Sequence, residues 1–585
     1  MARNNSFRMI CTWMLMAIAT VAGAQERFSV ATAPGQQQRG VSFGAPELRL
    51  SLQEAVTLAL EHNINIEVSR LGLAQSGEAL FGATGIFDPV LGADASNAYS
   101  SSPSTNQLQG ATVSESRRRT FDLSLGALLP LGTQTSVSWT NTRTTTNSSF
   151  YYLNPNYNSG LGLQIVQPFL KGFGTDVNRY GIEVARKNHE ISRLQFESII
   201  IATVQQVESA YWDLVYAREN LTVKEKSLKL AGDLLKQTQT RVRIGTSAPI
   251  DIVQSEATVA TREQEIIVAE HAVAEAADVL KGLMGYETLV DWSSNVVPAD
   301  DLTVARGPAD LDAAIATALE RRTELKQEEI QRAIQEMNLV VAENQIRPQL
   351  DLTLGYGLTG VGGTLHLEDP ATGIITTVPG GWDDALQMLR DAKYDQWSAA
   401  VAFRYPLGNN QARAQRAQAR YQLHSAEQLL AAQRQSVIQD VRRAVRALQS
   451  SGKSIDAAAK ARELAERNLD AEQKKFANGM STNYQVLQIQ DDLAAALAAE
   501  LQSRVAYRKS MVGYSVSTGT LLDAMGVGLQ EEQGKKEPHT LWKDVNWMRF
   551  GHWAELDEAE NDEGDDTDKG EMKPNTAPAA KEQTQ

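Results

Sequence analysis

The sequence has almost no cysteine: of its 585 residues only Cys11 is one. Cys11 lies inside an N-terminal segment with the pattern of a secretory signal, so the mature chain would contain neither a thiol nor a disulfide. There is also no cysteine at the expected cleavage site to carry a lipid. Cysteine usage therefore excludes thiol chemistry and lipid anchoring at that site, and it says nothing direct about redox compartment.

Long apolar runs are also missing. The candidate MICTWMLMAIATVA follows Arg3 and Arg8 and ends before the cleavage pattern Ala22-Gly23-Ala24. A membrane anchor is the competing interpretation, but the run is shorter than the roughly 20 apolar residues that span a bilayer. We expect residues 1–24 to be a signal peptide and residues 25–46 an N-terminal extension. Because no later run is long enough for a membrane helix, a membrane crossing would require a β-barrel.

Motifs for chemistry are scarce as well. The net charge of −15 makes nucleic acid an improbable partner. The seven histidines are scattered and predict no metal site, and no nucleophile elbow or catalytic triad is present. SGKS at 451–454 lacks the first glycine of a phosphate loop, and a polar loop rather than a helix follows GYGLTG at 355–360. The sequence predicts no catalytic residue and no cofactor, and hence no enzyme.

What the sequence does contain is an internal repeat. LSLQEAVTLALEHNINIEV at 50–68 resembles ADLDAAIATALERRTELKQ at 309–327, an offset of 259 that Pro89 and Pro348 share. Further on the offset is 234, as between Gly245 and Gly479, so the first copy carries an insertion. This predicts two copies of one unit, over residues 47–290 and 300–525. Residues 526–585 form a Trp-bearing segment and an acidic tail, ELDEAENDEGDDTDKGE, which we expect to be disordered.

Each copy is expected to begin with one amphipathic helix, about 50–84 and 309–345, and to continue with strands. Apolar and small or polar residues alternate in FDLSLGAL (121–128), LGLQIVQPFL (161–170), LDLTLGYGL (350–358) and WSAAVAFRY (397–405). Such segments, with aromatic ends and polar loops between them, are typical of an outer-membrane barrel, although a soluble β-sandwich fits the alternation equally well. LPLGTQTSVSWTN at 129–141 adds strand-like sequence to the first copy alone. It is compatible with a wider barrel, an external hairpin or a segment folded inside.

The rest of each copy has almost no helix-breaking residues. Residues 178–243 contain no proline and two internal glycines, and a helix of that length would reach roughly 100 Å. We expect return helices from about 249 to 283 and, in the second copy, helices over about 412–476 and 483–512. Apolar residues recur every three to four positions, so these helices are expected to pack side by side as coiled coils. Gly245 can close one helix in the left-handed conformation, Thr246 or Ser247 can cap the next, and Pro249 fits its first turn. Gly479, with Ser481 or Thr482, is expected to make the second hairpin tip.

The whole pattern resembles the TolC-like outer-membrane efflux family over about residues 47–525. The resemblance rests on the duplicated ALEHN and ALERR helices, on QPFLKGFG (167–174), YPLG (405–408) and VESAYWDLVYARENL (207–221), and on the two glycine-tipped breaks. It implies a mixed fold in which a homotrimer builds one β-barrel from a few strands per protomer. A long α-helical coiled-coil tunnel would continue the barrel into the periplasm. Open strand edges are not tolerated in lipid, which independently requires oligomerisation.

The resemblance also assigns roles to the tips. A periplasmic adaptor would dock there, on a surface made of Gly245, Thr246, Ser247, Ala248, Gly479, Met480, Ser481 and Thr482. Asp251 matches an aspartate of the family's tunnel gate, where three carboxylates would favour cations. Gln485 and Gln488 stand where the prototype has aspartates, and Ser481 where it has an arginine, which puts the acidic ring in doubt. Asp251 as an ordinary helix-capping residue is the competing interpretation.

The expected function is therefore a passive exit duct in the outer membrane, in contact with outer-membrane lipid. It would serve a tripartite efflux or type I secretion system together with an adaptor and an inner-membrane pump of RND or ABC type. Two alternatives stay open. One is a trimeric coiled-coil tether that does not conduct, and the other is a duct dedicated to polypeptides.

Overall fold

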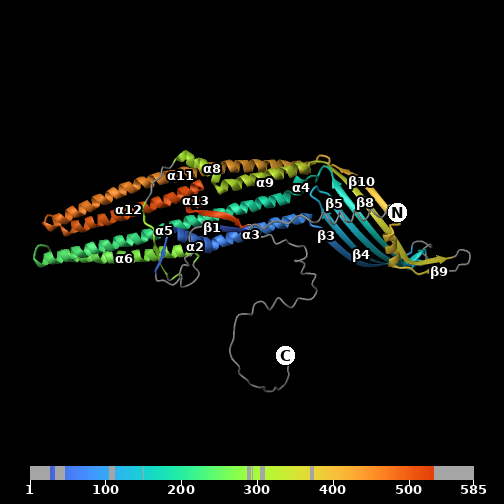
Figure 1. Ribbon diagram of the computed structural model, residues 1–585, viewed down its shortest axis with the longest axis horizontal. Helices are drawn as coiled ribbons and strands as arrows, with labels where there is room; N and C mark the ends of the chain where they lie inside the picture. The colour runs from blue at the N-terminus through green and yellow to red at the C-terminus, as the bar shows by residue number, and fades with distance from the viewer. Residues whose placement is uncertain are drawn as a thin grey trace, which may run out of the picture. The chain divides into compact units, whose positions relative to one another are not determined.

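A computed structural model describes residues 27–32, 47–104, 112–148, 150–285, 292, 294–303, 310–368 and 375–532. The expected signal peptide and the tail beyond residue 532 lie outside these ranges. Residues 25–533 form one compact unit, in which long helices extend from one end of a β-sheet (Figure 1). None of the described helices is long and apolar enough to cross a membrane.

Two halves of the chain contain similar elements in a similar order. The first comprises β2 (Glu47–Leu50), α2 (Leu52–His62), α3 (Ile64–Thr84), η1 (Gly85–Phe87), β3 (Val90–Pro103), β4 (Val113–Leu128), β5 (Gln134–Thr146), β6 (Leu153–Pro168), α4 (Thr175–Asn178), α5 (Tyr180–Arg243) and α6 (Ile250–Leu283). The second comprises β7 (Asn295–Pro298), α8 (Leu311–Arg321), α9 (Thr323–Gln345), β8 (Gln349–Glu368), β9 (Ile375–Val378), α10 (Trp382–Arg390), β10 (Asp395–Arg404), α11 (Asn410–Ala477), α12 (Asn483–Thr518) and α13 (Leu521–Met525). The strands β1 (Arg27–Thr32) and β11 (Val527–Glu532) pair antiparallel, while β2 and β7 pair in parallel.

The first helix of each half differs from the expectation of one continuous helix. The backbone is extended at Asn63 and at Arg322, which divides each stretch into two helices. Asn63 serves as the N-cap of α3, because its side chain accepts hydrogen bonds from the backbone N–H groups of Asn65 and Ile66. The apolar pattern runs through the break without interruption, and for that reason periodicity alone did not reveal it.

The sheet contains more strands than the alternating pattern of apolar and polar residues predicted. Its order is β10-β8-β6-β5-β4-β3, with β9 paired to the far end of β8. The strand-like insertion of the first half forms most of β5, which lies between β4 and β6. The sequence left three placements open for this insertion. The structure shows that it widens the sheet. The two outer strands, β3 and β10, each pair on one side only within the described chain.

Strand register gives the sheet one apolar and one polar face, because successive side chains point to opposite sides. One row across the six long strands, on the apolar face, consists of Leu91, Leu125, Val137, Leu163, Tyr356 and Trp397. The neighbouring row on the polar face consists of Gly92, Ser124, Ser138, Gly162, Gly357 and Gln396. The two faces are thus suited to different surroundings.

The main core surrounds the middle of α5, where α2 and α3 pack against it. Val204, Val207, Tyr211 and Leu214 are fully buried, as their spacing of three to four residues predicts. The Tyr211 hydroxyl donates to the carboxylate of Asp300 at 2.8 Å, which ties the end of β7 to the long helix. A smaller cluster in the second half contains Val437, Val441 and Val445 of α11 together with Ala318 of α8.

One acidic side chain is enclosed beside this core. Glu208 of α5 is buried near Trp212 and near Arg508 of α12, whose guanidinium lies 4.8 Å from the centre of the Trp212 ring. Burial raises the pKa of Glu208 to about 7, against the lowering effects of Trp212 and Arg508. The folded protein therefore keeps Glu208 protonated to a higher pH than an exposed glutamate.

We predict a stability change with pH that depends on Glu208. Because the folded-state pKa is raised, the stability associated with the protonated carboxyl is complete below about pH 4.5 and is lost as the pH rises toward 7, a loss of about 3 kcal/mol. Glu208→Gln should remove this part of the pH dependence and stabilise the protein at pH 7.5. Guanidinium unfolding followed by circular dichroism between pH 4.5 and 7.5 measures it. The exposed Glu219→Gln on the same helix is the matched control, and identical pH profiles for all three proteins would contradict the assignment.

Candidate gate and docking site at the hairpin tips

The two long hairpins end in turns of the same geometry. Gly245 has φ +80° and Gly479 has φ +76°, in the left-handed region that favours glycine. The N–H of Thr246 donates to the carbonyl of Arg241 at 2.8 Å, and the N–H of Met480 donates to that of Lys475 at 2.9 Å. With the glycine N–H bonds to Val242 and Phe476, each turn is a Schellman motif, which satisfies the last carbonyls of the helix.

The two return helices begin differently. The Thr482 side chain caps α12 by accepting from the N–H of Gln485, as one of the sequence alternatives expects. Helix α6 has no side-chain cap, and Thr246 instead donates its hydroxyl to the carbonyl of Arg241 in the preceding helix. The expected capping of α6 by Thr246 or Ser247 is therefore wrong. The side-chain hydrogen bond at the start of α6 comes from Asp251, a residue of its first turn. The Asp251 carboxylate accepts from the backbone N–H of Ala248 at 3.2 Å.

A buried asparagine joins the two hairpins close to their tips. Asn483, at the start of α12, accepts from the hydroxyl of Thr238 on α5 at 3.1 Å. Its amide group donates to the hydroxyl of Ser255 on α6 at 2.9 Å and to the backbone carbonyl of Asp251 at 3.2 Å. Asn483 is 4% exposed, so these bonds are shielded from water and one side chain connects three helices.

An arginine makes a second connection between the hairpins. Arg241, in the last turn of α5, donates to the backbone carbonyls of Phe476 and Ala477 at the end of α11. Its guanidinium also lies 4.2 Å from the centre of the Phe476 ring, within the range of a cation–π interaction. A positive charge at the carboxyl end of a helix is favourable for the helix dipole. We call Thr238, Arg241, Ser255 and Asn483 together the tip clasp.

A charged group links the hairpins further from the tips. Arg262 of α6 forms ion pairs with Asp491 of α12 and with Glu265, to which Lys224 of α5 is also hydrogen-bonded. Although burial raises the pKa of Glu265, the hydrogen bonds from Lys224 and Arg262 outweigh it and hold that pKa below its usual value. The carboxylate therefore stays ionised between its two cationic partners.

Within the described residues, no hydrogen bond or ion pair joins the predicted gate residues Asp251, Gln485 and Gln488 to one another. Asp251 is half-buried, and its carbonyl contacts the tip clasp through Asn483. Gln485 and Gln488 are exposed on α12, and Gln485 accepts a hydrogen bond from the hydroxyl of Ser481 at 3.2 Å. Ser481 also donates to Glu472, and the hydrogen bonds from Ser481 and Lys475 lower the pKa of Glu472.

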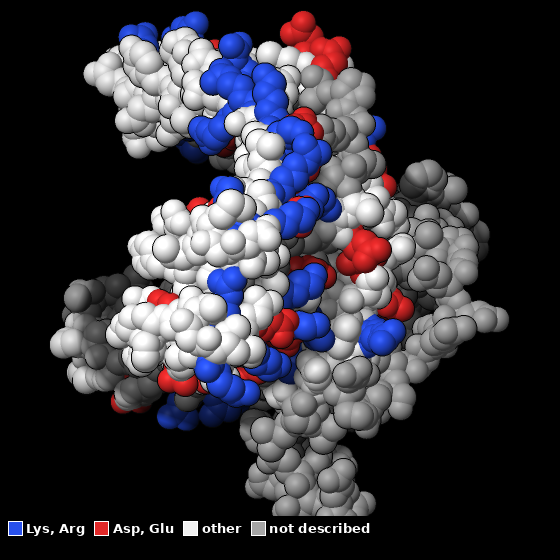
Figure 2. All heavy atoms as spheres, turned by 90° about the vertical axis from the view of Figure 1, so that its left-hand side faces the viewer, with Lys and Arg blue, Asp and Glu red and all other residues white. Residues whose placement is uncertain are grey.

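Apolar side chains are exposed around both tips. The side chains that are more than half exposed there are Ile244, Ile250, Val253, Met480 and Tyr484. Basic residues lie beside them, since Arg243 and Lys474 occupy the last turns of α5 and α11. Figure 2 views the molecule from this end and shows Lys and Arg side chains in a band with fewer acidic ones among them. Within the described ranges, no group of three or more His, Cys, Asp or Glu is placed to hold a metal ion.

Comparison with known proteins identifies the class. Residues 131–286 and 314–519, more than half of the chain, match the family described as outer membrane efflux protein. The chain belongs to this family of outer-membrane channels, which are not enzymes. Members are trimeric and work with adaptor proteins and inner-membrane pumps, and their helices form a tunnel in the periplasm. The protein is accordingly an outer-membrane protein.

Individual relatives are distant. The chain is 22% identical to the pyoverdine export outer membrane protein OpmQ of Pseudomonas aeruginosa over 84% of this chain and 87% of that protein. Among solved structures, CusC superimposes with a TM-score of 0.58 at 16% identity, covering 84% of this chain and 100% of CusC. VceC of Vibrio cholerae superimposes with a TM-score of 0.57 at 15% identity, covering 82% and 97%. At these identities the solved structures support the fold alone.

We predict that Asn483→Ala loosens the hairpin tips. The substitution leaves the buried hydroxyl groups of Thr238 and Ser255 without this partner, which costs about 1–3 kcal/mol. Amide hydrogen exchange should become faster over residues 238–255 and 476–490 while the core of α5 keeps its protection. Asn478→Ala is the matched control, because Asn478 is exposed and bonds only within its own helix end. Unchanged exchange at the tips would show that Asn483 does not hold them.

Proposed function

We propose that the protein is the passive exit duct of a tripartite efflux or type I secretion system. A homotrimer would receive cargo from an inner-membrane pump of RND or ABC type through a periplasmic adaptor and release it outside. The observation that supports this most strongly is the two-faced sheet, whose strands continue directly into the paired long hairpins. Energy would come from the pump, because the proposed duct is passive.

The sheet supports assembly into a closed barrel. An apolar face suits lipid and a polar face suits a water-filled lumen. The edge strands β3 and β10 would be left with unpaired backbone groups in lipid, and pairing β3 of one copy with β10 of the next removes both edges. Six strands from each of three copies would close a barrel of 18, in the range of about 16–18 strands that encloses an aqueous channel.

We also infer that the two halves are copies of one structural unit. The supporting observation is the shared order of a divided helix, strands and a long hairpin with a glycine tip. Stacking two such hairpins from each of three copies would build the tunnel wall from twelve long helices. The extra pair of strands in the first half would then be an insertion that widens the barrel and leaves the tunnel unchanged.

The tips are the proposed docking surface for the adaptor. This surface consists of Gly245, Thr246, Ser247, Ala248, Gly479, Met480, Ser481 and Thr482, and exposed apolar side chains flank it. Clustered apolar groups at the end of a water-exposed hairpin favour burial against a partner protein. Asp251, Gln485 and Gln488 are the proposed gate residues, and opening would repack the tips about the clasp.

The proposed cargo is an efflux substrate. The name of OpmQ assigns it to pyoverdine export, and at 22% identity a compound of that kind is one candidate cargo for this chain. A duct dedicated to polypeptides stays an alternative, and the wide sheet favours it over a narrow pore. A tether that does not conduct is the other alternative, although it would not need a polar sheet face.

Single-channel conductance in planar bilayers tests the duct. We expect discrete openings from the purified protein and a cation preference that falls in Asp251→Ala, because removing three carboxylates weakens attraction for cations. Asp278→Ala, on the exposed side of α6 away from the tip, should leave the preference unchanged. Openings insensitive to Asp251→Ala would keep the duct and remove the gate assignment. An absence of openings, even with Asn483→Ala, would favour the tether.

Cross-linking tests the docking surface. The mature chain has no cysteine, so Ser247→Cys introduces a single thiol at the tip for a photoreactive maleimide. With the purified periplasmic adaptor of the same organism we expect a cross-link from position 247 and none from Ser454→Cys, which is exposed midway along α11. Equal cross-linking from both positions would contradict specific docking at the tips.

A further inference from the structure

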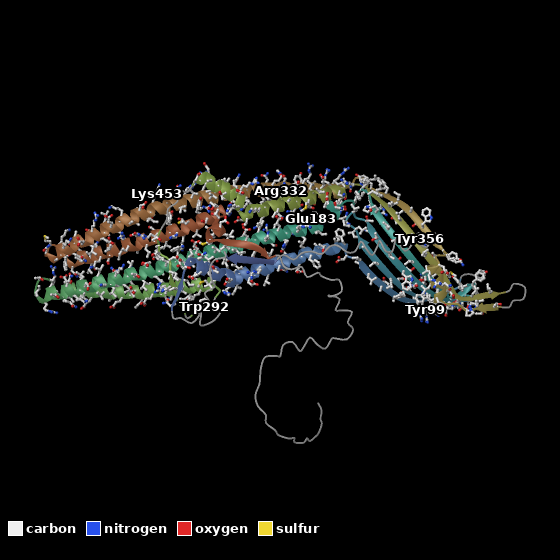
Figure 3. All side chains as sticks on the ribbon, viewed as in Figure 1. Tyr99, Glu183, Trp292, Arg332, Tyr356 and Lys453 are labelled. Carbon is white, nitrogen blue, oxygen red and sulfur yellow. The ribbon has the colours of Figure 1, made fainter. Side chains whose placement is uncertain are left out.

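The apolar face of the sheet ends in a row of arginines. On β4, the positions that follow Leu125, Leu123 and Phe121 along this face are Arg119 and Arg117. Strand β5 adds Arg143, which lies directly opposite Arg119 in the register. These residues lie toward the end of the sheet farthest from the helices, where Figure 3 shows Tyr99, the register partner of Arg117.

The three arginines have no acidic partner in the described part of the chain. No carboxylate there lies within ion-pair distance of Arg117, Arg119 or Arg143, although Glu115 is on the same face one pair further out. Like charges placed directly opposite on neighbouring strands are destabilising, and the Arg119–Arg143 pair is of that kind. An anion bound between the two guanidinium groups would convert this repulsion into two charge-assisted contacts.

Tyrosines hold two of the arginines against the sheet. The Nε of Arg143 donates to the hydroxyl of Tyr157 at 3.0 Å, and its guanidinium lies 5.7 Å from the centre of that ring. The Arg117 guanidinium lies 5.9 Å from the centre of the Tyr99 ring. Aromatic side chains of this kind are enriched where a membrane protein passes from hydrocarbon to headgroups. The arginine row is therefore at headgroup level if the apolar face is in lipid.

A short helix packed on the sheet supports the same placement of the arginines in the membrane. Helix α10 lies against β8 and β6 on the apolar face, and a Cβ at Gly360 would be only 2.0 Å from the carbonyl oxygen of Ala385. The ring of Trp382 stacks on Trp139 with centroids 6.0 Å apart, and its indole N–H donates to Asn141, two residues before Arg143. A tryptophan at this level of the sheet fits the aromatic belt found at membrane interfaces.

We propose that Arg117, Arg119 and Arg143 form a binding site for the phosphate groups of a phosphorylated glycolipid in the outer leaflet of the outer membrane. This inference rests on the proposed membrane insertion of the sheet. The planar guanidinium groups match phosphate oxygens in pairs, and the adjacent apolar rows receive the acyl chains. The site would fix the vertical position of the sheet in an asymmetric membrane.

Lipid retention tests the site. The purified full-length protein is exchanged into nanodiscs of zwitterionic phospholipid containing bisphosphorylated lipid A, and retained lipid A is measured by native mass spectrometry. We expect retention by the unaltered protein and a loss of about tenfold or more in affinity in the triple variant Arg117→Gln, Arg119→Gln, Arg143→Gln. Arg118→Gln is the matched control, because Arg118 is on the same strand but on the polar face. It should retain lipid A as the unaltered protein does.

Two further measurements separate the possible failures. Lipid A without its phosphate groups should be retained no better by the unaltered protein than by the triple variant. Equal retention of lipid A by all proteins, or of the lipid with and without phosphate, would overturn the site. Conductance of the triple variant in phospholipid bilayers should equal that of the unaltered protein, so a defect in lipid binding is distinguishable from a failure of the duct itself.

Discussion

The constraint on which this structure depends is that a backbone N–H or C=O group cannot stay unpaired in hydrocarbon. The sheet has an apolar face suited to lipid, yet it ends in two strands whose outer backbone groups have no strand partner among the described residues. In the proposed trimer, neighbouring copies would pair with both edges. The polar face and the long hairpins would then line one continuous path.

The helices meet a different requirement. Helices as long as α5 and α11 are too long to be covered by one globular core, so burial is divided between the main core and several smaller clusters along their length. Between those clusters, polar contacts such as the tip clasp and the Arg262 group set how the hairpins lie against each other. Polar contacts can exchange partners with little loss of apolar burial. The tips are thus the part of the bundle whose contacts can change with the least loss of apolar burial.

Much of the fold could be predicted from the sequence because it depends on strong local signals. The lack of proline over residues 178–243 predicts a helix close to the observed Tyr180–Arg243, and the glycines at 245 and 479 mark the two turns. The break at Asn63 was missed because it leaves the apolar period intact. Asn483 and Arg241 were missed for another reason: their importance comes from residues more than 200 positions away, and no local pattern encodes such a contact. The arginines at 117–119 were visible as charges, but only the strand register showed that two of them share a face with Arg143.

The connection made by Arg241 has a consequence for how the tips vary among related sequences. Both of its acceptors are main-chain carbonyls at the end of α11, and every residue type supplies such a group. A substitution at Phe476 or Ala477 removes no acceptor, whereas a substitution at Arg241 removes the donor entirely. The hydrogen bonds of this link thus depend on the side chain of Arg241 alone, whereas the opposite hairpin contributes side-chain specificity only through the ring of Phe476.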